Sequence, residues 1–375
     1  MKTNYNKLKL TGVFLLLLLT VIGKPDTVRA AAAEKIGLNQ SYQIQVPDSS
    51  DPFLYEFTVP EAGNINVQVK NADPVGTERV KVQLYDSNNN ALTDAWYGVN
   101  VELPVYPTGG NRTFYIRLSN YYSDAAFYFL TVNFQPTTDW ETEDNNTTAK
   151  ADPITSGKKW YGAINDMNDP CDYFRFRLSS NKKVTITFGP GEVSGENNRW
   201  NVNLINSSNK SQRIYESGST TQTYTCYLKK GTYYLQVENY YSDNNVVYAL
   251  SYKESALKLE QPAITSMKLT GHESFWGSYV ELSSIRIKNS GDATGYTVRV
   301  AKKKSMKGKL ATENIDFKDT NTKKQVVFPA DLPVLKTYYV QVRSYVTDPF
   351  GTRIYGKYGA VKSKSLSSSV YKKLK

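Results

Sequence analysis

The sequence predicts an all-β protein built from consecutive β-sandwich domains, on three observations. The stretch Asn-Tyr-Tyr-Ser-Asp occurs at residues 120–124 and again at 239–243, a spacing of 119 residues. A repeat of this length is a duplicated domain rather than a solenoid unit. Alternating apolar residues flank both copies, as in strands with one buried face. Aromatic residues make up 13% of the 375-residue chain, and no long stretch has a helical period.

Residues 1–32 are predicted to be a secretory signal peptide. A lysine-containing start precedes an apolar run over residues 10–23, and small residues follow it. This order is typical of a cleavable secretion signal. The alternative is a membrane anchor, but the run is shorter than the ~20 residues that span a bilayer. We therefore expect a secreted, extracellular protein without a membrane span.

The basic charge of the protein is concentrated in its last third. The net charge is +11, yet residues 255–375 alone carry 18 Lys and 4 Arg against 4 Glu and 5 Asp, a net +13. A basic face outside the cell most often meets anionic polymers or surfaces, and the alternative is a solvated lysine-rich surface. No nucleic-acid-binding module is recognisable. The expected partners are an extracellular polysaccharide, a matrix protein or a cell-envelope polymer.

The duplication defines two predicted sandwich domains, residues 36–135 and 139–254. At the offset of 119, Phe57 aligns with Phe176, and the alternating apolar positions that follow each of them also align. Each copy contains enough short alternating strands for a β-sandwich or jelly roll.

The second repeat resembles the bacterial pre-peptidase C-terminal domain. Three motifs in the family's order carry the resemblance: Glu-x-Glu-x-Asn at residues 141–145, Asp-Tyr-Phe at 172–174 and Gly-Thr-Tyr-Tyr at 231–234. The first repeat is similar to a divergent copy without the acidic leader. The resemblance implies non-catalytic β-sandwich appendages of secreted bacterial proteins, a family that includes collagen-binding modules.

The acidic leader is the predicted metal site. Glu141, Glu143 and Asn145 alternate, so they point to one side of an extended chain. Hard oxygen ligands of this kind suit Ca²⁺, which takes 6–8 oxygens. The resemblance implies these three residues and Asp172 as calcium ligands. Asp169 is a further acid of the neighbouring turn, although the family's second aspartate lies closer to the strand. The alternative is a solvated acidic linker.

The first repeat is predicted to bind no calcium. Alignment of residues 51–55 with 169–173 places Leu54 at the position of Asp172, and no Glu-x-Glu leader precedes it.

Two cysteines, Cys171 and Cys226, lie in the second repeat. In the first repeat Phe53 and Val105 align with them, so both positions are expected to face inward. Export favours a disulfide, which across 55 residues is worth about 4 kcal/mol in the chain-entropy model. Two buried free thiols that pack as small hydrophobes are the equal alternative.

The sequence predicts no active site. The single histidine, His272, has no second ligand with which to build a zinc site, and we expect it in a surface loop. The chain contains no Gly-x-Ser-x-Gly elbow and no recognisable glycosidase carboxylate pair.

Residues 262–366 resemble a fibronectin type III domain, an immunoglobulin-like sandwich. The resemblance rests on an alternating strand at 339–345 and on a Leu-to-Tyr corner, residues 332–338, that precedes it. The family's tryptophan is absent from the second strand, so Ile285 or Ile287 is expected to fill the core. Such domains act as spacers or adhesion modules. The basic tail, residues 367–375, is expected to be disordered.

The predicted function is that of a non-catalytic binding or adhesion protein that engages a polysaccharide or a collagen-like protein. Aromatic rings offer large contact areas for such ligands, although each could equally anchor its own loop. The alternatives are a cell-envelope spacer held at the cell surface by the basic third domain and an extracellular hydrolase of unrecognised type. The candidate contact residues are Trp96, Tyr97, Tyr121, Tyr122, Tyr240 and Tyr241.

Overall fold

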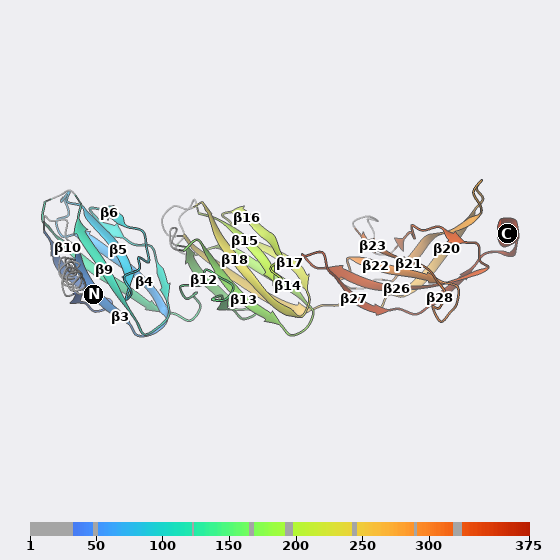
Figure 1. Ribbon diagram of the computed structural model, residues 1–375, viewed down its shortest axis with the longest axis horizontal. Coiled ribbons are helices and arrows are strands. Elements are labelled where there is room, and N and C mark those ends of the chain that lie inside the picture. Colours follow the sequence, from blue (N-terminus) through green and yellow to red (C-terminus); the bar gives the residue numbers. More distant parts are fainter. Residues whose placement is uncertain are drawn as a thin grey trace, which may run out of the picture. The chain divides into compact units, whose positions relative to one another are not determined.

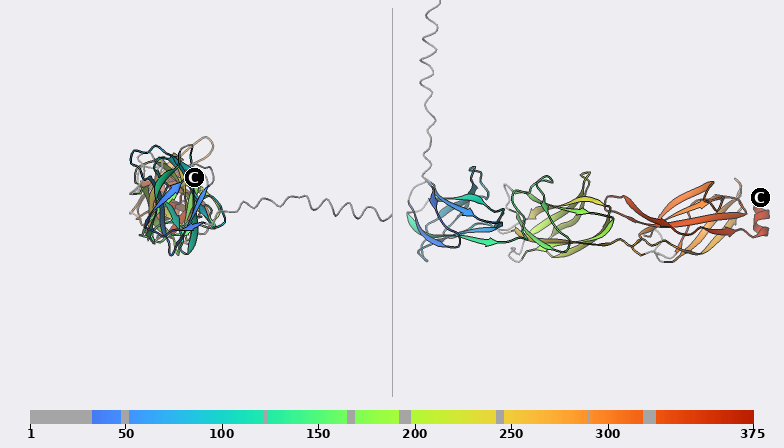
Figure 2. Two further views of the ribbon diagram at one scale, coloured as in Figure 1. Left: turned by 90° about the vertical axis from the view of Figure 1, so that its left-hand side faces the viewer. Right: turned by 90° about the horizontal axis from the view of Figure 1, so that it is seen from below.

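The protein is almost entirely β-structure, which confirms the predicted fold class (Figures 1 and 2). The computed structural model describes residues 33–47, 52–121, 124–164, 169–191, 198–241, 246–288, 291–317 and 325–375. The predicted signal peptide therefore lies outside the described residues. The one helix of the described chain has seven residues, and it is too short to span a bilayer.

The described residues form two compact units. One unit contains residues 33–103 and 109–136, and the other contains residues 104–108 and 137–375. The first unit holds the first repeat. The second unit holds both the second repeat and the third domain, which share direct contacts. Phe350 stacks on Tyr233 with ring centroids 6.4 Å apart, and Lys183 pairs with Asp292 at 3.2 Å.

The first repeat consists of two sheets whose inward positions are apolar. One sheet has the order β1-β3-β9-β5-β6, and the other has the order β2-β10-β4-β7. Alternate residues of the long strands are buried, as a period of two requires when one face meets the core. The strands are β1 Glu34–Lys35, β2 Ser41–Val46, β3 Phe53–Val59, β4 Gly63–Asn71, β5 Val80–Asp86, β6 Trp96–Gly98, β7 Val101–Glu102, β9 Arg112–Asn120 and β10 Ala126–Pro136.

The second repeat has the same arrangement, with sheets β11-β13-β18-β15-β16 and β12-β19-β14-β17. Its core contains an aromatic cluster, in which Tyr248 packs against Phe174, Phe188 and Trp200. The strands are β11 Asp152–Pro153, β12 Lys159–Ile164, β13 Cys171–Leu178, β14 Lys182–Pro190, β15 Arg199–Asn206, β16 Ser211–Gly218, β17 Gln222–Leu228, β18 Gly231–Tyr241 and β19 Val246–Ala256. The short strand β8, Tyr106–Thr108, belongs to the first repeat in the chain and is in neither sheet of the second repeat.

Strand register corrects one part of the predicted alignment. Phe53 pairs with Leu118 in the first repeat, and Asp172 pairs with Val237 in the second. Because Leu118 and Val237 are separated by the repeat offset of 119, the counterpart of Asp172 is Phe53 and not Leu54. The predicted match was one residue out of register, which in a strand exchanges the two faces. By the same register the counterpart of Cys171 is Pro52 and not Phe53.

The third domain is a sandwich of one sheet with the order β20-β21-β24 and another with the order β23-β22-β26-β27. Ile285 and Ile287 are both buried in its core, as predicted. The predicted corner is also present, because the Tyr338 hydroxyl donates to the Pro333 carbonyl oxygen at 2.7 Å. The strands are β20 Ile264–His272, β21 Tyr279–Ile287, β22 Gly295–Ala301, β23 Lys309–Asp316, β24 Gln325–Val326, β25 Leu332–Pro333, β26 Thr337–Thr347, β27 Arg353–Tyr358 and β28 Lys362–Ser365.

The C-terminal tail is ordered, contrary to the prediction of disorder. Residues 368–374 form helix α1, Ser368–Leu374, whose first turn is capped by the Ser367 side chain. Tyr371 and Leu374 are three residues apart, so they share one helix face, and both pack against the core of the third domain. Composition alone indicated disorder because three apolar residues in nine, Val370, Tyr371 and Leu374, are a weak signal. The spacing of Tyr371 and Leu374 is what lets the tail bury them.

Candidate functional site

The acidic leader of the second repeat folds into a buried carboxylate cluster. Glu141, Glu143 and Asp172 each place one oxygen within 4.8 Å of the others. Their exposed fractions are 2%, 6% and 0%. The leader is held beside β12 by a bridge between Trp140 and Tyr161, whose rings stack with centroids 5.6 Å apart. Asp172 comes from β13, so a strand and a non-local segment together form the cluster.

Two of the carboxylates share one hydroxyl group. The Ala163 backbone N–H donates to Glu141 Oε1 at 2.5 Å, and the Tyr248 hydroxyl lies 2.9 Å from Glu141 Oε2. The same hydroxyl also contacts Asp172 Oδ2. A tyrosine hydroxyl carries a single proton, so it can donate to only one of these carboxylates at a time. The other carboxylate requires a different partner.

Asn145 completes the inner face of the leader. Its Nδ2 donates to Glu141 Oε2 and to Asp152 Oδ2, both at 3.1 Å. Among the described residues, Asn145 Oδ1 and Asp172 Oδ1 are buried without a hydrogen-bond partner. Buried polar atoms in native proteins nearly always have partners, and exceptions indicate an ion, a water molecule or a function.

The cluster is electrostatically unfavourable without a cation. Burial, with the nearby Asp169 charge, raises the pKa of Glu141 to about 8. Burial also raises the pKa of Asp172 well above its usual range, and the charges of Asp169, Glu141 and Glu143 raise it further. The pKa of Glu143 is raised in the same way, first by burial and then by Asp169 and Glu141. A bound cation would favour the charged form of every one of these groups.

The structure brings all five predicted metal ligands together. Asp169 is buried, and its carboxyl group is hydrogen-bonded to Glu143, although the tight group of three oxygens does not include it. The donor set is carboxylate and amide oxygen, which suits a hard cation such as Ca²⁺. The residues present therefore fit the ion, and a solvated acidic linker does not describe them.

Three residues around the cluster were missed by sequence reasoning: Gly162, Tyr248 and Asp152. A Cβ atom on Gly162 would lie 2.2 Å from the Tyr248 hydroxyl and 2.7 Å from Glu141 Oε2. Only glycine leaves room for the leader to approach β12 at this position. Comparison of the two repeats could have indicated the importance of Gly162, because the first repeat has a larger residue at the corresponding position.

The first repeat has apolar side chains at the corresponding positions. Ile44 pairs with Tyr128 as Gly162 pairs with Tyr248, so Ile44 is the counterpart of the glycine. Ile44 and Tyr128 are both buried. Phe53 takes the place of Asp172, as the strand register shows. The prediction that this repeat binds no calcium stays a prediction, and it now has a steric basis.

The cysteines are free thiols, but only Cys226 is buried; Cys171 is partly exposed, so the expectation that both positions face inward holds for Cys226 alone. Cys226 lies on β17 in one sheet and Cys171 on β13 in the other. Cys226 is buried in the core, and this burial raises the pKa of its thiol to about 12. Such a thiol is a packing residue rather than a nucleophile at neutral pH.

The predicted contact aromatics form two separate surface features. Tyr97 and Tyr121 lie in the first repeat with ring centroids 4.5 Å apart, and Trp96 beside them is half-buried. Tyr122 lies outside the described residues. Tyr240 and Tyr241 in the second repeat are each 58% exposed. The pairing of β15 with β18 passes from Asn239 directly to Tyr241, so Tyr240 is the extra residue of a β-bulge, a device that re-aims a side chain.

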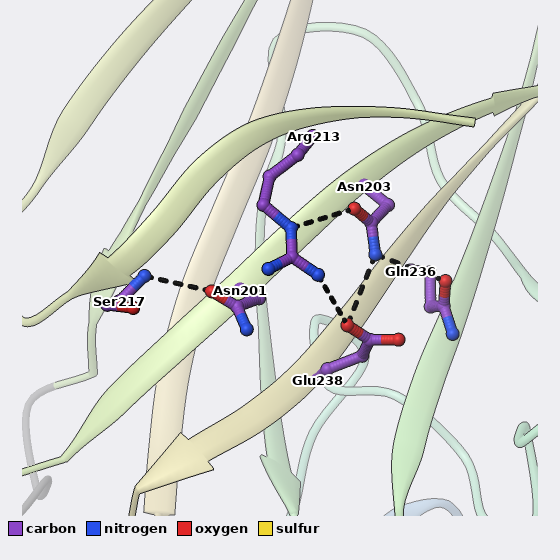
Figure 3. A network of polar contacts seen from close by, with 6 residues as sticks. All are labelled: Asn201, Asn203, Arg213, Ser217, Gln236 and Glu238. Carbon is purple, nitrogen blue, oxygen red and sulfur yellow. Dashed lines mark hydrogen bonds and ion pairs between the residues drawn. The ribbon is translucent and has the colours of Figure 1, made fainter.

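A polar network that the sequence did not reveal covers the outer face of the sheet β13-β18-β15-β16 (Figure 3). Asn203 Nδ2 lies 3.3 Å from Gln236 Oε1 and 3.2 Å from Glu238 Oε2. Arg213 donates from Nε to Asn203 Oδ1 and pairs with Glu238, both at 3.3 Å. These contacts hold amide and charged groups in place on the outer face of the sheet.

His272 lies at the end of β20, not in the predicted surface loop. Its ring stacks on Tyr279, with centroids 4.8 Å apart, and its Nε2 lies 3.1 Å from Glu281 Oε2. These contacts give the histidine a packing role within its hairpin.

No family model matches the chain, and no curated protein matches it. Among solved structures, the chain is similar to the pre-peptidase C-terminal domain of collagenase from Bacillus anthracis, at 23% identity over 28% of this chain and 97% of that one, with a TM-score of 0.23. It is also similar to an archaeal virus turret protein with a triple jelly roll fold, at 14% identity over 82% and 84% of the two chains, with a TM-score of 0.21. A tandem CBM22 domain from Paenibacillus barcinonensis matches at 9% identity over 57% and 87%, with a TM-score of 0.20.

Proposed function

We propose that this protein is a secreted, non-catalytic binding protein of bacterial type that engages an extracellular polymer, with a calcium ion holding its second repeat together. The observation that carries the proposal is the buried cluster of Glu141, Glu143 and Asp172, whose oxygens lie within 4.8 Å of one another. The first and second repeats are then two members of the pre-peptidase C-terminal type, of which only the second retains the metal site.

Calcium would be bound by the three carboxylates together with the amide oxygen of Asn145, and Asp169 would add negative charge beside them. When bound, the ion would offset the repulsion among these acids and would provide a partner for the buried oxygen atoms. Its role is structural, because the ligands tie the leader to β13 and thereby close one end of the sandwich.

The calcium proposal is tested by calorimetry and thermal unfolding of the full chain. One ion per chain should bind, and at ~100 times its dissociation constant it should add about 2.7 kcal/mol to the stability of the second repeat. Asp172→Asn keeps the size of the side chain but removes its charge, so it should abolish the calcium-dependent shift. Thr187→Ala, on an exposed face of the same repeat, is the matched control. Identical melting curves in calcium and in chelator, with no heat of binding, would refute the proposal.

The polymer-binding surface that we propose is the outer face of the sheet β13-β18-β15-β16, with Tyr240 and Tyr241 at its end. The network of Asn203, Gln236 and Glu238 supports this assignment because pre-positioned hydrogen-bonding groups reduce the entropy cost of binding. The two exposed tyrosines would provide the stacking area that sugars and extended peptides use.

An array of polysaccharides and collagen-like peptides tests this surface. Saturable binding should fall by about tenfold or more when Tyr240 and Tyr241 are both changed to alanine, since such anchors typically contribute 1–2 kcal/mol or more. Tyr97→Ala in the first repeat controls for the loss of an exposed ring elsewhere. Unchanged affinity in the folded double variant would remove these tyrosines from the site. Turnover of any polymer would instead favour an enzyme.

A second candidate function is a cell-envelope spacer held by the third domain. The strand orders β20-β21-β24 and β23-β22-β26-β27, together with the Tyr338 corner, support a fibronectin type III-like domain. Its net charge supports contact with anionic envelope polymers. Wall binding by the full chain that weakens with salt, and that the Tyr240→Ala/Tyr241→Ala variant retains, would favour this function over the first.

A further inference from the structure

The turn between β20 and β21 carries the two most exposed large apolar side chains of the described chain. Phe275 is 94% exposed and Trp276 is 92% exposed. We call this pair the aromatic tip. The turn is closed by its own groups, because the Gly277 N–H donates to the Ser274 carbonyl at 3.2 Å and the Ser274 hydroxyl donates to the Gly277 carbonyl at 2.7 Å. The two rings are therefore not needed to hold the turn together.

The geometry of the aromatic tip does not suit a sugar-binding platform. The planes of the two rings are 88° apart and their centroids 5.3 Å apart, so they offer no common flat surface. Their exposure also shows that no groove encloses them. Two unshielded rings on a convex turn instead form a small apolar wedge, and exposed apolar groups of this kind mark an interaction site.

The end of the third domain that carries the aromatic tip also carries helix α1 (Figure 1). Lys373 Nζ pairs with Glu273 Oε2 at 3.0 Å, and Leu374 packs beside Gly271 of β20. The acid nearest to the aromatic tip is thereby paired with a cation. Lys372 and Lys375 of the same terminal segment are exposed.

Strand pairing brings a second group of lysines to the same end. Tyr279, the first residue of β21 after the turn, pairs with Pro333. The Pro333 carbonyl oxygen accepts a hydrogen bond from the Tyr338 hydroxyl. The next residue, Tyr339, pairs with Ala301, the last residue before the turn at 302–308. We call the other exposed lysines at this end the lysine arc; they are Lys302, Lys303, Lys304, Lys307, Lys336, Lys372 and Lys375.

We propose that the aromatic tip and the lysine arc dock the third domain onto an anionic lipid bilayer. Phe and Trp side chains partition to the boundary between headgroups and acyl chains, where the indole N–H stays hydrated. Lysines beside them meet lipid phosphates, each strengthening binding by about fivefold near an anionic surface. The two features need each other, since a few apolar groups or a few cations alone bind membranes only weakly. A hydrated polysaccharide offers cations a partner but offers an apolar wedge no apolar layer to enter.

The test is co-sedimentation of the full chain with vesicles of phosphatidylcholine alone and of phosphatidylcholine mixed with phosphatidylglycerol. Binding should require phosphatidylglycerol. Phe275→Ser/Trp276→Ser should lower the partition coefficient by about tenfold or more. Lys302→Gln/Lys303→Gln/Lys304→Gln should lower it by about a hundredfold, since three cations near the anionic surface are lost. Lipids brominated near the headgroup should quench Trp276 fluorescence, measured as the difference between the wild type and Trp276→Phe.

Matched variants separate this proposal from other modes of binding. Phe127→Ser/Phe129→Ser removes a second exposed aromatic pair, in the first repeat, and should leave vesicle binding unchanged. Tyr240→Ala/Tyr241→Ala should also leave it unchanged, so failure of the polymer-binding proposal and failure of this one are distinguishable. The proposal is overturned if the full chain ignores anionic vesicles, if it binds them equally without the aromatic tip, or if the aromatic tip is needed only for binding a soluble anionic polysaccharide.

Discussion

The two repeats share a strand arrangement, but they fill the space beside a buried core tyrosine with residues of opposite chemistry. Where Tyr128 of the first repeat faces Ile44, its counterpart Tyr248 faces Gly162. The glycine leaves space that the leader fills with Glu141, whose carboxylate the Tyr248 hydroxyl contacts. The first repeat fills the space beside its tyrosine with the buried apolar side chain of Ile44. The second repeat fills the corresponding space with the buried carboxyl group of Glu141. The comparison shows that a β-branched residue at the position of Gly162 would leave the acidic leader no room to pack against β12.

The largest expected effect on stability comes from shortening the buried apolar side chain of Ile44 in the first repeat. Ile44→Ala should destabilise the first repeat by about 2–5 kcal/mol, since it removes buried methyl groups and leaves a cavity. Denaturant unfolding in calcium and in chelator should give the same loss, because no acidic leader is available to fill the space. If calcium restored the lost stability, the first repeat would itself bind calcium, contrary to our inference.

Removal of the ion should act on the second repeat alone. Chelation should cost it about 2.7 kcal/mol relative to calcium at ~100 times the dissociation constant. Hydrogen exchange should then quicken at β12, β13 and the leader, while β2, β3 and β10 of the first repeat keep their protection. Equal changes in both repeats would show that calcium does not act on the second repeat alone.

Gly162→Ala makes the second repeat resemble the first. The added methyl group would lie against the Tyr248 hydroxyl and Glu141, so we expect a loss of about 1–3 kcal/mol from overpacking. Calcium affinity measured by calorimetry should fall as well, because the leader must move away. Ser156→Ala, which removes an exposed hydroxyl group that accepts from the Glu254 N–H near β12, provides a control. Full calcium affinity in Gly162→Ala would show that the leader does not depend on this space.

The smallest effect should come from Asp152, which supports the leader without joining the cluster. It accepts hydrogen bonds from the Thr142 N–H at 2.7 Å and from Asn145 at 3.1 Å. Asp152→Asn should cost about 1 kcal/mol through weaker hydrogen bonds and should leave one calcium ion bound per chain. A change in stoichiometry would place Asp152 among the ligands.

Much of the candidate site can be predicted from the amino-acid sequence. Glu141, Glu143 and Asn145 alternate along an extended segment and so share one side of it, and resemblance to the family assigns Asp172 to them. All of these residues are buried together. The supporting residues escape prediction because their roles are steric or depend on contacts far along the chain. Nothing local to Gly162 or Tyr248 indicates that they meet Glu141, from which Tyr248 is separated by 107 residues.

The amino-acid sequence is enough to predict the fold class, the duplication and the acidic residues that cluster in the second repeat. These follow from period-two patterning, from self-similarity and from residue chemistry, all of which are local or can be compared directly along the chain. The three-dimensional arrangement was needed to show that Phe53 is the counterpart of Asp172, that the tail docks as a helix, and that Phe275 and Trp276 share an end with the lysine arc. Register, docking and the gathering of distant side chains depend on which strands pair and where each one ends, and pairing is a property of the whole sandwich.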